Sequence, residues 1–201
     1  MKVCGMDPSL RSWGVSKGNW VNGALELYEV GVCNPILPTG KQVRQNSLDV
    51  ESAKQLFAYA LSATKGVDAV FVEIPIGSQS ARAMAGYAIC CGVLGALRAM
   101  GIPFFEVTPT EVKLAGPGSK TATKQEMIDW AVAKHPEANW PTYKQKGREI
   151  INTTKAEHQA DATGAIYAGL ASNSFQQLLP FLRQQIPVSY THLTLPTKRI
   201  V

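Results

Sequence analysis

The chain contains 201 residues, of which 45% are hydrophobic and 17% are charged, a balance typical of one folded domain with a sizeable core. This composition excludes an extended disordered chain, and the sequence contains no apolar run long enough to cross a bilayer. Asp7 follows the first six residues directly, which leaves no space for the apolar segment of a signal peptide. We therefore expect a cytoplasmic protein with no membrane partner.

The formal net charge of +5 favours a polyanionic partner. The final segment, residues 188–201, breaks the helical pattern before it and resembles a translated adapter or a fusion scar. We expect one domain over residues 1–187, followed by a non-native or disordered tail. Without Lys198 and Arg199, the 20 basic residues become 18 against 15 acidic ones, so the domain itself is mildly basic at +3.

The N-terminal part of the chain is predicted to form three strands and a helix. Asn22-Gly23 lies between two alternating segments, and this pair supplies the positive φ angles that a tight hairpin turn needs. Residues 34–46 contain two prolines and a glycine and are predicted to form a loop. Apolar side chains from Val50 to Leu61 then recur at the spacing of an amphipathic helix. The predicted strands are residues 2–6, 12–19 and 24–32, and the predicted helix is residues 48–64.

The rest of the chain alternates between strands and helices. Residues 68–74 are apolar on both faces, a pattern typical of a central strand that helices cover on both sides. Residues 116–122 are predicted to form a flexible loop, and the polar residues 135–154 are predicted to be irregular. This order predicts an α/β fold with a mixed sheet flanked by helices. The other predicted elements are a strand at 103–107 and helices at 80–100, 111–115, 124–134, 156–171 and 174–185.

The four cysteines have no spacing typical of a zinc or redox site. They are Cys4, Cys33, Cys90 and Cys91, and no CxxC pair occurs among them. We therefore expect plain buried or half-buried thiols.

Two carboxylates occupy strand ends. Asp7 follows the first predicted strand, and Glu73 follows three apolar residues of a central one. Because ligands of open α/β sheets bind beyond the carboxyl ends of the strands, both carboxylates are expected to face one crevice. A carboxylate in an apolar strand is costly to bury unless a cation or hydrogen bonds compensate. The alternative is that each acid is bonded to loop amides.

A third polar cluster lies on the helix predicted at 156–171. Asp161 shares a helical face with both Glu157 and His158, so either residue could join it at a metal ion. The sequence from Thr154 to Glu157 matches a capping box, which gives Glu157 a structural role and favours His158 as the partner of Asp161. The alternative for His158 is an ordinary surface or core histidine. Small residues after Asp161 suit close packing on the sheet.

This set of side chains is typical of a divalent-metal site. Three carboxylates and an imidazole suit Mg²⁺ or Mn²⁺. Two such ions about 4 Å apart can activate a water and stabilise the leaving oxygen of a phosphodiester, so no nucleophilic serine or cysteine is needed.

Four segments of the chain resemble a known family, the RuvC-type Holliday-junction resolvases of the RNase H-like superfamily. Their opening strand and turn resemble GMDPSLRSWG at residues 5–14, and their second acidic strand resembles VE at residues 72–73. Their final acidic helix resembles HQADA at residues 158–162. Their DNA-contacting segment is similar to residues 108–124, which contain a lysine, a Gly-rich loop and a second lysine. Four weak motifs in the right order make a fairly specific match.

The resemblance implies an RNase H-like fold and a metal-dependent endonuclease that resolves four-way DNA junctions by paired phosphodiester hydrolysis. It also implies two Mg²⁺ or Mn²⁺ ions and a bacterial or phage origin. The implied catalytic residues and metal ligands are Asp7, Glu73, His158 and Asp161. The implied DNA contacts are Lys113 and Lys124, with Lys120 as a further candidate, because lysines beside a flexible loop suit phosphate oxygens. A plain solvated loop is the alternative for these lysines.

The chain departs from the family pattern at three places. Ser9 replaces a turn glycine, and Ile76 stands where some members carry an aromatic wedge. An apolar residue can still insert between bases, so Ile76 is a candidate DNA contact. The segment 136–155 is longer than expected and mixes aromatic and basic residues, which favours either a DNA contact or an ordinary loop. Those residues are Trp140, Tyr143, Lys144, Lys146 and Arg148.

The resemblance also implies a homodimer, because a nearly two-fold junction calls for two symmetric active sites. The Ala- and Gly-rich helix at 80–100 is the expected packing surface, although burial inside the domain would explain its composition as well. Another RNase H-like nuclease, acting on RNA–DNA hybrids, flaps or other branched DNA, is the nearest alternative. A non-catalytic DNA-binding module is a further one. An actin- or sugar-kinase-like ATPase would need a second phosphate loop that the sequence lacks, so no nucleotide cofactor is expected.

Overall fold

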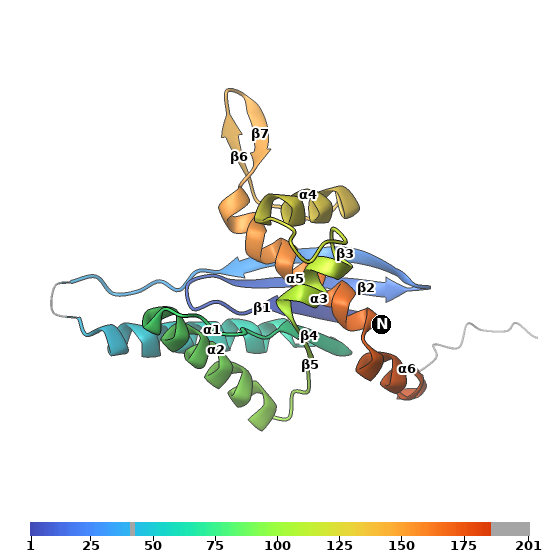
Figure 1. Ribbon diagram of the computed structural model, residues 1–201, viewed down its shortest axis with the longest axis horizontal. Coiled ribbons are helices and arrows are strands. Elements are labelled where there is room, and N and C mark those ends of the chain that lie inside the picture. The colour runs from blue at the N-terminus through green and yellow to red at the C-terminus, as the bar shows by residue number, and fades with distance from the viewer. Residues whose placement is uncertain (41–42, 186–201) are drawn as a thin grey trace, which may run out of the picture.

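The computed structural model describes residues 1–40 and 43–185 (Figure 1). The predicted tail at 188–201 lies outside the described residues. Among the helices of the described part, none combines the length and the apolar character that crossing a membrane requires.

A mixed five-stranded sheet forms the centre of the molecule, as the sequence predicts (Figure 1). The order of the strands is β3-β2-β1-β4-β5; the first three are antiparallel, and β4 and β5 run parallel to β1. The predicted hairpin turn is confirmed, since Asn22 and Gly23 have φ angles of 52° and 83°. The strands are β1 (Lys2–Asp7), β2 (Trp13–Val21), β3 (Ala24–Cys33), β4 (Ala69–Glu73) and β5 (Phe105–Val107).

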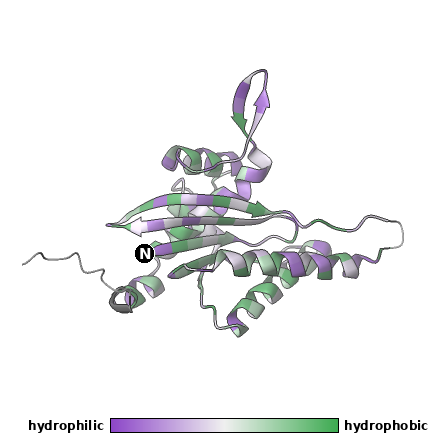
Figure 2. Ribbon diagram, turned by 180° about the vertical axis from the view of Figure 1, so that it is seen from behind, coloured by the Kyte–Doolittle hydropathy of each residue, from purple (hydrophilic) through white to green (hydrophobic). Residues whose placement is uncertain are grey.

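Helices cover both faces of this sheet, and each face has its own apolar core. Strand residues alternate between the two cores, so that Val3 and Phe71 belong to one and Met6 and Val72 to the other. Figure 2 shows hydrophobic residues along the strands of the sheet and on the helices that cover it. The helices of the first core are α3 (Pro109–Ala115), α4 (Lys124–Lys134), α5 (Thr153–Ala171) and α6 (Asn173–Gln185), and those of the second are α1 (Gln45–Ala63) and α2 (Ala81–Ala99).

Helix α5 lies unusually close to β1 and β2. A Cβ atom added at Gly5 would collide with the carbonyl oxygen of Ala162, and one added at Gly14 would collide with that of His158. Ser16 seals the contact by donating its hydroxyl to the carbonyl oxygen of Gln159 at 2.9 Å. The small-residue face predicted for this helix is therefore packed on the sheet. This close packing fixes the position of the polar side chains of α5 relative to the strand ends.

Helix α1 buries most of its predicted amphipathic face, including Leu56 and Ala60, but departs from the prediction in its first turns. It begins at Gln45, and it buries Asp49 while Val50 is 70% exposed. Arg82 of α2 explains the burial of Asp49, because its guanidinium donates to both carboxylate oxygens of Asp49 at 2.6 and 2.7 Å. Two-point pairing of this kind compensates a charge that hydrophobic periodicity alone would place outside.

The predicted capping box at the start of α5 is wrong. Asn152 caps the helix, and its side-chain oxygen accepts the backbone N–H of Lys155 at 3.3 Å. Thr154 is already inside the helix. Glu157 is therefore free of the capping role and forms an ion pair with Lys124 instead.

The prediction of an irregular segment at 135–154 is also wrong. Strands β6 (Thr142–Gln145) and β7 (Arg148–Ile151) form a hairpin that projects from the body beside α4 and α5 (Figure 1). Lys146 and Gly147 turn the chain with φ angles of 48° and 77°. Trp140 is part of the core and donates its indole N–H to the carbonyl oxygen of His135 at 2.7 Å.

Three cysteines follow the prediction of buried or half-buried thiols. Cys4 and Cys90 are buried and Cys33 is half-buried. Cys91 contradicts it, because it lies on the exposed side of α2.

Candidate functional site

Asp7 and Glu73 end neighbouring parallel strands at the same edge of the sheet. Met6 of β1 is paired with Val72 of β4, so the two carboxylates occupy the next position on each strand. Since side chains alternate along a strand, both point to the face that α5 covers. The chain leaves β1 toward β2 and leaves β4 toward β5 on the other side, which makes this edge a topological switch point.

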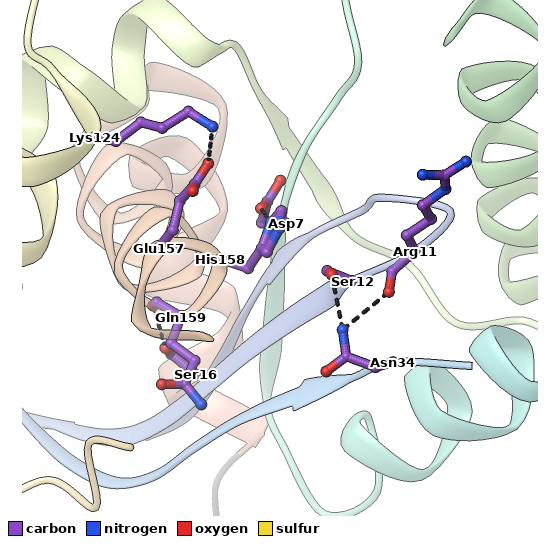
Figure 3. Close-up of polar contacts among 9 residues, drawn as sticks. All are labelled: Asp7, Arg11, Ser12, Ser16, Asn34, Lys124, Glu157, His158 and Gln159. Atoms are coloured by element: carbon purple, nitrogen blue, oxygen red, sulfur yellow. Dashed lines mark hydrogen bonds and ion pairs between the residues drawn. The ribbon is translucent and has the colours of Figure 1, made fainter. Parts of the chain in front are cut away.

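Helix α5 brings the predicted imidazole to these strand ends. The Nδ1 atom of His158 lies 2.6 Å from the Oδ2 atom of Asp7 (Figure 3). One cleft of about 230 Å³ contains both residues together with Glu73, Glu157 and Asp161. We call this region the acid cleft. The four predicted site residues, which come from three distant segments, therefore share one cleft, and their chemical roles remain a prediction.

Burial and nearby negative charges raise the pKa of two carboxyl groups of the acid cleft, those of Glu73 and Asp161. Burial, together with the charges of Asp7 and Asp161, raises the pKa of Glu73 to about 9. Burial, together with the charges of Asp7 and Glu157, raises the pKa of Asp161 to about 7. Near neutral pH Glu73 is therefore protonated and Asp161 partly so, and a bound cation would favour the ionised forms of both.

His158 is the internal counter-ion of the cleft. Burial acts to lower its pKa, but the hydrogen bond and the charge of Asp7 outweigh burial, so the pKa of His158 lies above its ordinary value. A protonated His158 therefore neutralises Asp7 in part. A metal ion that binds His158 must displace this proton.

The donor set fits a hard divalent cation. Within residues 1–40 and 43–185, no three acidic, histidine or cysteine side chains already stand close enough together to hold a metal ion. Asp7 is turned toward His158, and like charges separate when no cation lies between them. The fit rests on chemistry: three carboxylates and an imidazole face one cleft, and two of these carboxylates have raised pKa values.

Capping boxes begin the two helices that carry Lys113 and Lys124, two of the lysines predicted to bind DNA. Thr108 and Glu111 cap α3, which carries Lys113 in its last turn, and Thr123 and Glu126 cap α4, which begins at Lys124. Both T-x-x-E patterns are legible in the sequence, unlike the false one at Thr154.

The predicted DNA contacts differ in how near they lie to the acids. The charge of Lys113 lowers the pKa of both Glu73 and Asp161, although by less than burial raises it. The Nζ atom of Lys124 lies 2.5 Å from the Oε1 atom of Glu157 (Figure 3). Ile76 lines the cleft and is 76% exposed. Lys120 is exposed in the loop between α3 and α4 and does not line the cleft.

A second hollow adjoins the acid cleft, and the sequence did not single it out. Ser9 and Tyr87 line both spaces, and Arg11 and Arg82 supply cations to the second. Asn34 holds the turn after β1 by donating to the carbonyl oxygen of Arg11 at 3.0 Å (Figure 3). In the sequence, the indication of this second hollow was the position of Arg11, four residues after Asp7.

No family model matches this chain, and no curated protein matches it. Solved structures do. The chain is similar to Thermus thermophilus RuvC, solved alone and in complex with a Holliday junction substrate, with a TM-score of 0.59 and 22% sequence identity in each case. The match covers 90% of this chain and 96% of RuvC in the complex, or 97% of RuvC alone. The fowlpox virus Holliday junction resolvase also matches, at a TM-score of 0.49 and 12% identity over 89% of this chain and 99% of that one.

The comparison with T. thermophilus RuvC concerns architecture. The match extends over nearly the whole of both chains, including the mixed sheet and its flanking helices. The predicted fold is therefore confirmed: this chain has the RNase H-like fold of RuvC.

Proposed function

We propose that this protein is a metal-dependent endonuclease that resolves four-way DNA junctions by hydrolysing phosphodiester bonds. One observation carries the proposal: Asp7, Glu73, His158 and Asp161 face one cleft at the switch point of a RuvC-like fold. Burying carboxylates whose pKa values are raised costs stability, and a bound divalent cation would offset this cost.

These four residues are the ones that would hold the metal. A pair of Mg²⁺ or Mn²⁺ ions at such a site supplies a water of lowered pKa and neutralises charge on the scissile phosphate. Glu73, Asp161 and His158 would bind a cation in their deprotonated forms, so binding of the cation would release protons from these residues. Burial of the carboxylates excludes bulk water from their flanks and strengthens their attraction for the cation.

Lysines around the acid cleft are suited to orient the DNA backbone. Lys113 and Lys124 lie near the acids, where they would bind oxygens of the scissile phosphate or of the neighbouring DNA backbone. Lys120, on the exposed loop between them, would bind a phosphate farther away. Ile76 projects at the rim and would pack against a base exposed at the junction centre.

A second copy of the chain would complete the enzyme. Helix α2 buries one face against the sheet, whereas Met84, Ala88, Cys91, Gly92 and Gly95 are exposed. The helix is therefore not consumed by packing within the domain. Small exposed side chains let two such helices approach closely about a two-fold axis, which supports the predicted homodimer.

The direct test is cleavage of a synthetic mobile four-way junction. We expect paired, symmetric nicks with Mg²⁺ or Mn²⁺, no cutting with a chelator, and no cutting by the Asp7→Asn variant, which should still bind the junction. A folded protein that binds the junction equally well with and without metal and never cuts it would be a non-catalytic module. Faster cutting of a flap or an RNA–DNA hybrid than of the junction would favour another RNase H-like nuclease.

A further inference from the structure

The hairpin formed by β6 and β7, residues 142–151, takes almost no part in the core. Its residues are exposed except Ile151, which packs on the core at the base. We call this hairpin the arm. Because the arm buries little surface, it contributes little to the stability of the domain. Its side chains therefore have to show whether it is suited to bind a partner.

The root of the arm is held firmly. The backbone N–H of Asn152 donates to the carbonyl oxygen of Pro141 at 2.7 Å, which closes the base of the hairpin. Asn139 binds both the N–H and the carbonyl oxygen of Val30 on β3, at 2.8 and 3.1 Å. Trp140 is buried between these contacts. The arm therefore projects from an anchored base and is not an extension of a loose loop.

The arm carries three cations that form no ion pair within the described residues, and one of them, Lys144, lies opposite Glu149 in the strand register. In the part of the chain that the structure describes, Lys144, Lys146 and Arg148 form no ion pair, whereas Lys17, Lys54, Arg82, Arg98 and Lys124 each do. Glu149 is the single acid of the hairpin, so the net charge of residues 142–151 is +2. Unpaired cations on a projecting ribbon fit a polyanion.

The register adds an apolar pair to this charge. Tyr143 is paired with Ile150, and Gln145 with Arg148, so these four side chains share one face. Tyr143 is 45% exposed and Ile150 is 37% exposed. A face with one aromatic, one aliphatic and one guanidinium group is too small for a stable protein interface or for membrane insertion. It suits the sugars and phosphates that line a DNA groove.

The arm is also near the acid cleft. Asn152 closes the hairpin and caps α5, and His158 follows six residues later, about 9 Å along the helix axis. Each strand of the arm has four residues and so reaches about 13 Å. The cations at the tip would consequently lie within about 34 Å of a phosphate held in the acid cleft. This distance is about one helical turn of DNA.

We propose that the arm is a duplex-binding element, with Lys144, Lys146 and Arg148 on backbone phosphates and the Tyr143–Ile150 pair against the wall of the groove. A two-stranded ribbon has the width that a major groove admits. This inference rests on the proposed function, since it takes the DNA to be the same molecule that the acid cleft would cut.

The experiment measures binding of a four-way junction by the full chain without divalent metal, at several salt concentrations. The test variant is Lys144→Gln, Lys146→Asn and Arg148→Gln together; asparagine is chosen because it tolerates the positive φ at position 146. The matched control is Lys2→Gln, Arg44→Gln and Lys65→Gln, which removes two exposed lysines and one exposed arginine, none of them ion-paired, from elsewhere on the described surface.

The test variant should bind about 10- to 100-fold more weakly near 0.15 M salt, and its log–log salt slope should be shallower by about 2 to 3, because each lost phosphate contact contributes about 0.9. The control should keep the slope of the unaltered chain. Chemical footprinting should show phosphates within about one turn of the cut that the unaltered chain protects and the test variant does not.

A second variant guards against misfolding of the first. Replacing residues 143–150 by two glycines removes the projecting part of the arm, keeps the Thr142–Ile151 pair at its base, and should reproduce the same loss of affinity and slope. Lys144→Arg with Arg148→Lys, which keeps the charge, should restore both.

The outcomes separate the two proposals. If the unaltered chain binds and cuts junctions while the test variant keeps the same affinity and slope, the arm proposal is wrong and the proposed function stands. A loss of affinity with an unchanged slope also overturns it, because the cations would then contact no phosphate. If the folded, unaltered chain neither binds nor cuts any DNA, the proposed function itself is wrong and the arm proposal falls with it.

Discussion

The acid cleft and the arm are opposite solutions to handling charge. The cleft gathers half-buried carboxylates from three distant segments and neutralises them only in part, through His158. The arm is built from ten consecutive residues and leaves its cations in water. Burying like charges costs stability, whereas exposed lysines cost almost none. We infer that the fold tolerates a loss of stability in the acid cleft, where the proposed chemistry requires buried charges, and avoids such a loss in the arm, where exposed charges are sufficient.

The sharpest way to break this comparison is to neutralise the cleft. Glu73→Gln should lower junction cutting by about 10³-fold or more, because the variant lacks one of the proposed ligands of the metal. The same change should raise the melting temperature of the metal-free protein at pH 8.5 by roughly 2–4 °C, since a strained buried acid is removed. Cutting assays and thermal unfolding measure the two effects.

The matched control is Glu26→Gln, which makes the same chemical change at an exposed position of β3. It should alter neither quantity. Normal cutting by the Glu73→Gln variant would remove Glu73 from the site, and a lower melting temperature would show that its carboxylate is stabilising.

The next largest effect concerns the close packing that positions His158. Gly14→Ala places a methyl group against the carbonyl oxygen of His158 and should displace α5 from the strand ends. Cutting should fall about 100-fold, because displacements near 1 Å are enough for such a loss. Gly31→Ala on the neighbouring strand is the control, since its methyl group meets only the movable hydroxyl of Tyr59. Equal activities for the two variants would mean that α5 tolerates displacement.

The pH dependence sharpens the comparison further. The pKa values of about 7 for Asp161 and about 9 for Glu73 mean that cation binding must release protons, so cutting at limiting Mg²⁺ should rise between pH 6 and pH 9. Stability should change in the opposite direction. A carboxyl whose pKa is raised on folding contributes fully below its ordinary pKa, and this contribution is lost as pH rises toward the raised one.

The free energy of unfolding of the metal-free protein should therefore fall from pH 5 to pH 9. Added Mg²⁺ should stabilise the protein more at pH 8.5 than at pH 6. Denaturant titrations at a series of pH values test both statements, and a metal effect independent of pH would contradict the shifted pKa values.

The smallest effect is expected for the ion pair at the rim. Glu157→Gln removes the partner of Lys124, whose side chain is 76% exposed. Cutting should fall about 2- to 5-fold, because a solvated ion pair orients the lysine only weakly. The pKa of Lys124 should also move down toward its ordinary value, since its hydrogen bond to Glu157 is the main cause of its raised pKa. Nuclear magnetic resonance titration of the lysine measures this change.

The sequence predicted the sheet and most of the helices, because their signals are local. The apolar run before Glu73, the Asn22-Gly23 turn and the alternation of strands each depend on residues only a few positions apart. The positions of Asp7 and Glu73 at strand ends followed from the same patterns. That both carboxylates face one crevice was expected from the rule that ligands of open α/β sheets bind beyond the carboxyl ends of the strands, whereas the pairing of β1 with β4 came from the structure.

Only the tertiary structure decided which polar side chains are partners. Arg82 pairs with Asp49 and so allows this carboxylate to lie on the buried face of α1, Asn152 replaces Thr154 as the cap of α5, and Glu157 pairs with Lys124. The arm escaped prediction because Lys146-Gly147 is an uncommon turn pair and its strands lack a buried face to set a hydrophobic period. Hydrophobic periodicity is written along the chain, whereas the choice of a partner for a charge depends on distances that exist only after folding.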